Sequence, residues 1–227
     1  MVRPIYLSDA EHRQVSEAVA AAEMLTSGEI VTVLADRSDG YADIALAWSA
    51  LAAFTALAVM ALLPEFYLGQ FDRLTGNWNP EWSAGGIFGI AAAVGILKFL
   101  AAWLIQLWRP VKFALIPSPV KTGRVRARAV DLFKVGAERR THGRTGVLIY
   151  LSMREHRAEI VADEAIATMV EPEVWGEAMA AMIAQVREGR IADGIVVAVA
   201  EVGKVLAEKF PRSENDVNEV PDRLIEL

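Results

Sequence analysis

The chain has no cysteine among its 227 residues. This absence excludes a disulfide framework, a cysteine-ligated metal site and a thiol nucleophile. Only three histidines are present, and because His12, His142 and His156 are scattered along the chain, we interpret them as surface residues rather than metal ligands. The sequence also has no P-loop, G-x-S-x-G elbow, H-E-x-x-H helix or glycine-rich dinucleotide fingerprint. It therefore carries no strong catalytic signature.

The balance of charge is acidic, with a formal net charge of −6. Proteins that bind nucleic acid usually present an excess of Lys and Arg to the phosphates, so we expect no nucleic-acid partner. The first 43 residues are polar, and the first apolar run is too long and too late for a cleaved signal. We therefore expect no secretory signal peptide.

Two long apolar runs dominate the chain. Ile44–Leu63 is 20 residues without a charge, and Ala84–Leu107 is 24 residues whose single charge is Lys98. A helix rises about 1.5 Å per residue, so each run can cross a hydrocarbon core of about 30 Å. The alternative, two buried helices of a soluble core, would usually keep a polar face. The sequence predicts a two-helix transmembrane hairpin over residues 44–107, with spans at about 44–63 and 84–107.

Basic residues predict the orientation of this hairpin. Three arginines precede it, one lies in the loop Pro64–Ser83, and six basic residues with no acid lie in Trp108–Arg128. Because positive residues favour the cytoplasmic side, we expect a two-pass protein of the cell (inner) membrane, with the soluble domain and both termini in the cytoplasm. Aromatic residues near the span ends suit interfacial belts: Phe66, Tyr67, Trp78, Trp82, Trp103 and Trp108.

Small residues recur at four-residue spacing in both runs, which lets membrane helices approach closely. They favour pairing within the hairpin, with a second copy, or with a membrane-protein partner, although such residues are also common in membrane helices. Lys98 is interpreted as a side chain that reaches to the inner interface; the alternative is a pore-lining charge, which would indicate a channel or transporter subunit. The small residues are Ala45, Ser49 and Ala53 in the first run and Gly85, Gly89 and Ala93 in the second.

The remaining residues alternate between helical and strand periodicity. Helices flanking three strands predict a mixed α/β sandwich with a small central sheet, interrupted by the hairpin. We expect a split domain, residues 1–43 and 108–210, followed by a polar, poorly ordered tail, 211–227. Prolines in 110–119 are expected to prevent helix continuation. The predicted strands are 29–35, 145–153 and 158–162, and the predicted helices are 8–24, 122–140, 165–169, 172–186 and 194–209.

Several short motifs, in this order and spacing, resemble the TPM domain family and its bacterial membrane-anchored branch. The resemblance implies an α/β sandwich, divalent-metal binding and the acid-phosphatase activity of the thylakoid-lumen branch; other members assist the assembly or repair of membrane complexes. The chain departs from exported members by its membrane hairpin and its cytoplasmic orientation. The motifs are Thr26–Val31, Arg144–Ile149, Glu159–Asp163, Gly189–Gly194, Phe210-Pro211 and Asn218–Asp222.

Four carboxylates at strand ends are the candidate metal ligands. Asp163 and Glu164 end the third strand, and Asp36 and Asp39 follow the first. Ca²⁺ and Mg²⁺ take oxygen ligands, and ligands gather at the carboxyl ends of parallel strands. If the first and third strands run parallel, Asp36, Asp39 and Asp163 meet at one edge. The alternative is that all four are solvated turn residues. Asp163 alone matches a family motif.

The function expected from these patterns is a membrane-anchored TPM-like binding or accessory module that works near the cytoplasmic membrane surface. The alternative is a metal-dependent, acid-type phosphatase in which a cation held by Asp163 and its neighbours polarises a phosphate ester. Three arginines near the second and third strands, Arg144, Arg154 and Arg157, are candidates for holding an anion, with a simple charged turn as the alternative.

Overall fold

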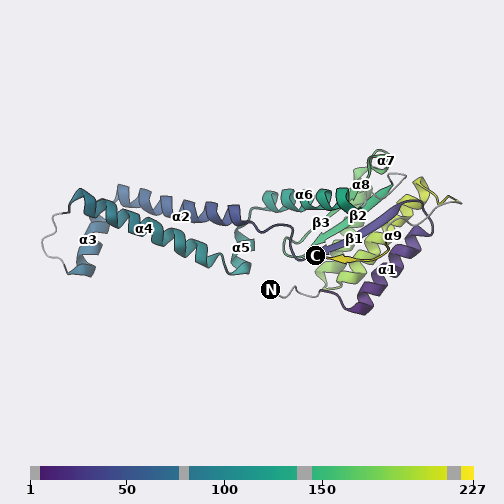
Figure 1. Cartoon of the computed structure of the whole chain (residues 1–227), viewed down its shortest axis with the longest axis horizontal. Helices are drawn as coiled ribbons and strands as arrows, with labels where there is room; N and C mark the ends of the chain where they lie inside the picture. Colours follow the sequence, from purple (N-terminus) through teal and green to yellow (C-terminus); the bar gives the residue numbers. More distant parts are fainter. Residues whose placement is uncertain (1–5, 77–81, 137–144, 214–220) are drawn as a thin grey trace. The chain divides into compact units, whose positions relative to one another are not determined.

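The computed structural model describes residues 6–76, 82–136, 145–213 and 221–227. The chain divides into two compact units, one made of Met1–Asp39 with Ser118–Leu227 and the other of Gly40–Pro117. The first unit is an α/β domain, and the second contains two long helices that form a hairpin (Figure 1).

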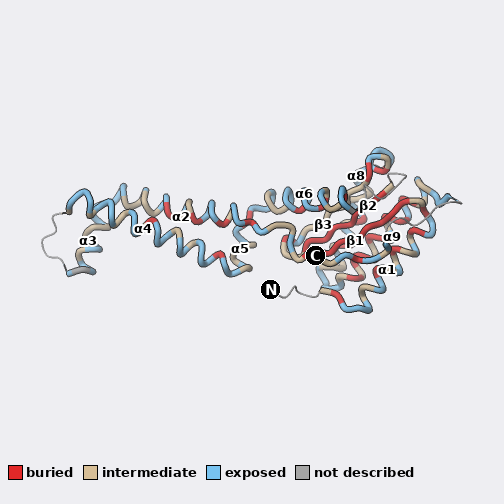
Figure 2. Tube along the Cα trace, viewed as in Figure 1, coloured by how far each residue is buried: buried red, intermediate tan, exposed pale blue. Residues whose placement is uncertain are grey.

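A four-stranded sheet in the order β3-β2-β1-β4 forms the centre of the α/β domain. β1 (Glu29–Ala35) is parallel to β2 (Gly146–Ser152) and to the short β4 (Ile225–Glu226), whereas β3 (Arg157–Ala162) is antiparallel to β2. Every residue of β1 and β2 is buried, as Figure 2 shows. Apolar runs of this kind are typical of central strands covered on both faces.

Helices cover both faces of the sheet. α6 (Ser118–Gly136) packs on one face, while α1 (Asp9–Glu23), α8 (Pro172–Arg187) and α9 (Ile191–Lys209) lie on the other, and the short α7 (Glu164–Ala167) follows β3 (Figure 1). Each face has its own apolar core. The predicted α/β sandwich is confirmed.

The predicted capping box opens α1. Ser8 Oγ accepts the backbone N–H of Glu11 at 3.4 Å, and Glu11 Oε2 accepts the N–H of Ser8 at 2.7 Å. These reciprocal bonds satisfy two of the four N–H groups that every helix start leaves without an intrahelical partner. The beginning of α1 is thus determined by local sequence.

In the second unit, α2 (Ala42–Leu62) and α4 (Ala84–Ile105) pack together as a hairpin, accompanied by α3 (Pro64–Thr75) and α5 (Arg109–Leu115). Both long helices are long and apolar enough to cross a membrane, judged by length and composition. Only 11% and 6% of their apolar windows are buried. Their side chains therefore present an apolar surface to the surroundings.

The contact between α2 and α4 uses small residues. The predicted row Ala45, Ser49 and Ala53 is the buried face of α2. In α4 the buried residue is Gly95, where an added Cβ would lie 3.4 Å from Leu57. The other predicted row turns away from α2 and is exposed: Gly85, Gly89 and Ala93.

One sequence prediction is corrected by the structure. The tail is not wholly without structure, because Ile225 pairs with Val33 in the sheet and Leu224 is buried. The prediction that prolines prevent helix continuation is confirmed, because α4 ends at Ile105 before Pro110 and α5 ends at Leu115 before Pro117. Pro110 and Pro119 themselves lie in the first turns of α5 and α6, where the absent N–H has no intrahelical acceptor in any case. Residues 137–140, the end of the predicted helix 122–140, lie outside the described residues.

Candidate functional site

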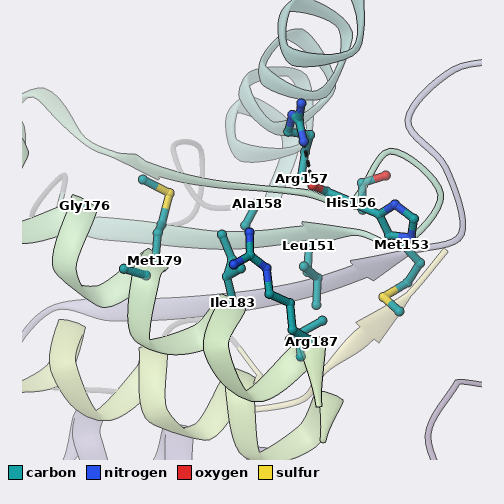
Figure 3. A pocket seen from close by; sticks show the side chains of 12 residues that line it. Leu151, Met153, His156, Arg157, Ala158, Gly176, Met179, Ile183 and Arg187 are labelled. Carbon is teal, nitrogen blue, oxygen red and sulfur yellow. Dashed lines mark hydrogen bonds between the residues drawn. The ribbon is translucent and has the colours of Figure 1, made fainter. Parts of the chain in front are cut away.

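A groove of about 840 Å³ lies between α8 and the turn that joins β2 to β3. Its walls are apolar: Leu151 and Ala158 come from the two strands, and Met179 and Ile183 come from α8 (Figure 3). Cavities of about 300–1,000 Å³ with mostly apolar walls and a few polar groups are typical of small-molecule sites. The groove is therefore the candidate functional site of the domain.

Helical periodicity explains why α8 has side chains left to line the groove. Ala178 and Met182 form the buried face of α8. Met179 and Ile183 follow them by one position, about 100° around the helix, and therefore point away from the core. β3 is the edge strand, and all its residues are only half-buried. The groove occupies the space between this edge and the second face of α8.

The charged side chains at the groove are basic. Arg187 is the exposed last residue of α8, and His156 is exposed in the turn, where its φ is +51°. Within the described ranges Arg187 forms no ion pair, since its acidic neighbour Glu188 is bonded to Arg190 at 2.6 Å. None of the described lining residues is acidic. The groove thus has a positive end in a chain of net charge −6.

Arg157 contributes its backbone and stem rather than its charge. Its guanidinium donates to Ser118 Oγ at 2.7 Å, to Thr122 Oγ1 at 3.4 Å and to the carbonyl oxygen of His156 at 3.0 Å. Figure 3 shows this side chain pointing away from Met179 and Ile183. Arg187 is accordingly the strongest anion-binding group of the groove.

A buried hydroxyl network supports the turn beneath the groove. Ser38 Oγ lies 3.0 Å from the Tyr150 hydroxyl and donates to Ser152 Oγ at 3.1 Å, while Ser152 Oγ donates to Glu155. Glu155 also accepts the N–H of Ser38 at 3.0 Å. Burial raises the pKa of Tyr150. Because these polar atoms bond one another, the network holds the turn in place.

The predicted metal ligands do not converge. β3 is antiparallel to β2, and hence to β1, so the condition under which Asp36, Asp39 and Asp163 would meet is not fulfilled. Asp36 and Asp39 follow the end of β1 beside the β2–β3 turn, whereas the N–H of Asp163 donates to the carbonyl of Gly146 at the opposite end of the sheet. Among the described residues no group of three His, Asp or Glu side chains is arranged to hold a metal ion.

Each of these four acids has a local environment of its own. Arg154 Nε donates to both oxygens of Asp36 at 3.0 and 3.1 Å. Asp39 pairs with Arg124 at 3.1 Å, and Glu164 is exposed at the start of α7. Asp163 is buried, and its Oδ2 accepts the N–H of Gly146 at 2.8 Å. The interpretation as solvated turn residues is thus wrong for Asp163, whose carboxylate bonds the first residue of β2.

Tyr6 also contacts Asp36, through a hydroxyl that donates at 2.5 Å. Burial and the carboxylate of Asp36 raise the pKa of Tyr6 to about 12. The tyrosine therefore stays neutral at physiological pH, and together with Arg154 it ties the carboxylate of Asp36 to the domain.

Sequence reasoning missed the groove and one acidic cluster. Glu23, Glu29 and Asp222 line a cavity of about 150 Å³ together with Arg212. Burial raises the pKa of Glu23 to about 9. Arg212 and Asp222 are far from Glu23 and Glu29 in the sequence, so no local motif connects the two pairs. The predicted surface histidine His142 and the arginine Arg144 lie outside the described residues.

Part of the α/β domain is similar to a known protein family. Residues 113–205 match the family model of the TPM domain. This part of the chain is thus similar to a TPM domain. The matched segment includes β2, β3 and α8, and therefore every residue that lines the groove. β1 and α1 lie outside the match, although β1 completes the centre of the same sheet.

A solved structure with the same fold covers the whole chain. It is the NMR structure of the BA42 protein from the psychrophilic bacterium Bizionia argentinensis, with a TM-score of 0.57 and 18% identity over 100% of this chain and 99% of that one. At this identity the likeness shows the fold. The search of curated proteins found no match.

Proposed function

We propose that this protein is a membrane-anchored TPM domain that works as a binding module near the cytoplasmic surface of the cell membrane. The hairpin of α2 and α4 would be the anchor, and the groove beside α8 would be the binding site. The groove carries the proposal, because it combines apolar walls with the exposed guanidinium of Arg187. Such a site is suited to recognition without a covalent step.

The anchor is supported by the length and exposure of the two apolar helices. Since the chain has no cysteine, single cysteines introduced at Glu65 in α3 and at Ser213 in the domain would report each side of the membrane. A membrane-impermeant maleimide added to intact spheroplasts should label Glu65→Cys and spare Ser213→Cys. Labelling of Ser213→Cys in intact spheroplasts would reverse the proposed orientation.

Partners follow from the anchor. The lipid bilayer would be the first, and a membrane-protein subunit or a second copy would pack against the hairpin. Lys98 is exposed on α4, as expected for a side chain that reaches to the interface. Crosslinking in native membranes tests this part: a crosslinked species that contains the hairpin supports it, and an uncrosslinked monomer under all conditions contradicts it.

The second candidate is a metal-dependent acid phosphatase, supported by the TPM match. It would require Ca²⁺ or Mg²⁺ held by Asp163, with Glu164 as the adjacent carboxylate. The test is phosphate release from a generic aryl phosphate by the full chain with Ca²⁺, Mg²⁺ or chelator. We expect no metal-dependent release above the buffer blank. If phosphate release depends on the metal and is lost in Asp163→Asn, the protein is a phosphatase and the binding-module proposal is wrong.

This test needs a folding control, because the carboxylate of Asp163 bonds the backbone of Gly146. Asp163→Asn keeps one acceptor oxygen, so its thermal midpoint should stay close to that of the unsubstituted chain. A loss of activity without a loss of stability would assign a metal-binding role to Asp163. A parallel loss of both would assign the structural role only.

A further inference from the structure

We infer that the groove binds a small amphipathic anion, an alkyl or acyl chain that carries a carboxylate or phosphate group. This inference rests on the proposed role of the groove as the binding site and names its ligand class. It follows from the size of the groove, from its apolar walls and from the position of its one exposed guanidinium.

Size favours a small molecule over a protein. Twelve described residues line the groove, whereas a stable protein interface uses about 20–30 residues on each side. The volume of about 840 Å³ lies within the range of small-molecule pockets. The ligand should therefore enter the groove as a compact molecule.

The walls are suited to a hydrocarbon chain. Met179, Ile183 and Arg187 follow one another at four-residue spacing along α8 and lie on one line of the helix (Figure 3). This line is roughly 12 Å long at about 1.5 Å per residue. Met153 and Met179 both line the groove, and methionine adapts its shape to irregular apolar ligands. A chain can lie along this line with its polar end at Arg187.

Charge decides the head group. Arg187 offers a planar fork of N–H donors that matches carboxylate and phosphate oxygens. Its side chain is exposed, forms no ion pair in the described part of the chain, and has no acidic neighbour among the described lining residues. His156 also lines the groove, where Figure 3 shows it beside Met153. A cationic or neutral head group would leave this guanidinium without an oxyanion partner.

The test uses the full chain in nanodiscs of zwitterionic lipid, because a detergent is itself an amphiphile. The probes are octyl phosphate, octanoate, octanol and inorganic phosphate, and the readout is the slowing of backbone hydrogen exchange in β3 and α8. Octyl phosphate and octanoate should protect both elements. Octanol and inorganic phosphate should each require at least about tenfold higher concentration. Octanol loses the hydrogen bond to a charged group, which contributes roughly 1.5–3 kcal/mol, and inorganic phosphate loses the burial of the alkyl chain, about 0.8 kcal/mol per CH₂.

Three variants locate the site. Arg187→Gln should weaken the binding of octyl phosphate and of octanoate about tenfold. Ala180 is at an exposed position of α8 that lines the groove, so Ala180→Phe should fill the groove and abolish protection by both anions. The control Arg126→Gln makes the same change of charge on α6, outside the groove, and should leave binding unchanged.

Three results would overturn the inference: equal binding of octanol and octyl phosphate, unchanged binding in Arg187→Gln, or no protection by any probe. Each is separate from failure of the proposed function. Metal-dependent release of phosphate from octyl phosphate would make the protein an enzyme, while octanoate, which has no phosphate ester, would still report the ligand class.

Discussion

The carboxyl group of Glu23, at the end of α1, accepts a hydrogen bond of 2.8 Å from the backbone N–H of Ile30 in β1. This bond connects a helix to the first strand across the short turn between them. Burial, opposed by the bond from Ile30, raises the pKa of Glu23 to about 9, and the negative charges of Glu29 and Asp222 add to the rise. Glu23 is therefore protonated at neutral pH.

This pKa predicts that stability declines as the solution becomes more alkaline. A folded-state pKa of about 9, above the ordinary value of 4.5, means that the folded chain binds the proton more tightly than the unfolded chain. The stabilisation is complete below pH 4.5 and is lost as the pH rises through 9. Glu23→Gln cannot ionise, so its thermal midpoint should rise relative to the unsubstituted chain between pH 5 and pH 9.

The control is Glu17→Gln, an exposed glutamate of the same helix. The difference in thermal midpoint between Glu17→Gln and the unsubstituted chain should stay constant between pH 5 and pH 9. A constant difference for Glu23→Gln as well would mean that Glu23 titrates near its ordinary value.

The ion pair between Asp36 and Arg154 predicts a cost for Asp36→Asn. The pair is partly buried, with side-chain exposures of 18% and 28%, and Tyr6 also bonds the carboxylate. Asp36→Asn should lower the free energy of unfolding by about 1–3 kcal/mol, measured as a shift of the urea midpoint. Arg124→Gln removes the more exposed partner of Asp39 and should change stability by less than about 1 kcal/mol. Equal costs in both variants would contradict the prediction.

Gly203 lies where α9 crosses α1. A Cβ added there would lie 2.8 Å from the Cβ of Ala22. Gly203→Ala should therefore destabilise the domain by about 1–3 kcal/mol. Gly123→Ala is the matched control: no described atom lies within 4 Å of its added Cβ, and alanine should stabilise α6 by up to about 1 kcal/mol. A lower thermal midpoint for Gly203→Ala and a higher one for Gly123→Ala would support both predictions. A higher midpoint for both variants would show that α1 shifts to make room for the added methyl group.

Gln106 joins the two helices of the hairpin. Its amide donates to the carbonyl oxygen of Ala45 at 3.1 Å and to Ser49 Oγ at 3.3 Å, and it is buried. Interhelical hydrogen bonds in membranes contribute about 0.6–2 kcal/mol, so Gln106→Leu should open the hairpin at lower SDS concentration. Gln70→Leu, on the exposed surface of α3, is the control.

Energy transfer between dyes on cysteines introduced at Ala42 and Leu107 reports this opening, because the chain has no other thiol. An unchanged SDS midpoint in Gln106→Leu would show that packing of α2 on Gly95 is sufficient to hold the helices together.

Local sequence patterns predicted the three longer strands, the two long apolar helices and the helices that cover the sheet, but not α3, α5 or β4. The arrangement of the site depends on distant contacts. The capping box of Ser8 and the apolar runs of β1 and β2 are set by neighbouring residues, and they formed as predicted. The direction of β3 relative to β1 depends on the turn at His156 and on the long connection through the hairpin. Periodicity carries no information on that direction, so the sequence left open whether Asp36 and Asp163 meet, and the antiparallel β3 places them at opposite ends of the sheet.

The groove could not be predicted from the sequence, because it too depends on contacts between distant elements. Met179 and Ile183 follow the buried positions of α8 by one residue and look like ordinary partly buried apolar residues. They line a groove only because β3 ends the sheet on that side. The basic end was visible as a run of charges around Arg154, but its strongest anion-binding group is Arg187, from another element.

The two central strands, β1 and β2, are synthesised far apart in time. Thr145, just before β2, bonds Ser27, just before β1, although the two are 118 positions apart. At about 5–20 residues per second, β1 leaves the ribosome roughly 6–24 s before its partner strand exists. During that interval the two long apolar helices are made, while the apolar strand β1 stays without its partner. The nascent chain is therefore most exposed to chaperones and proteases after its hairpin is complete and before its α/β domain is.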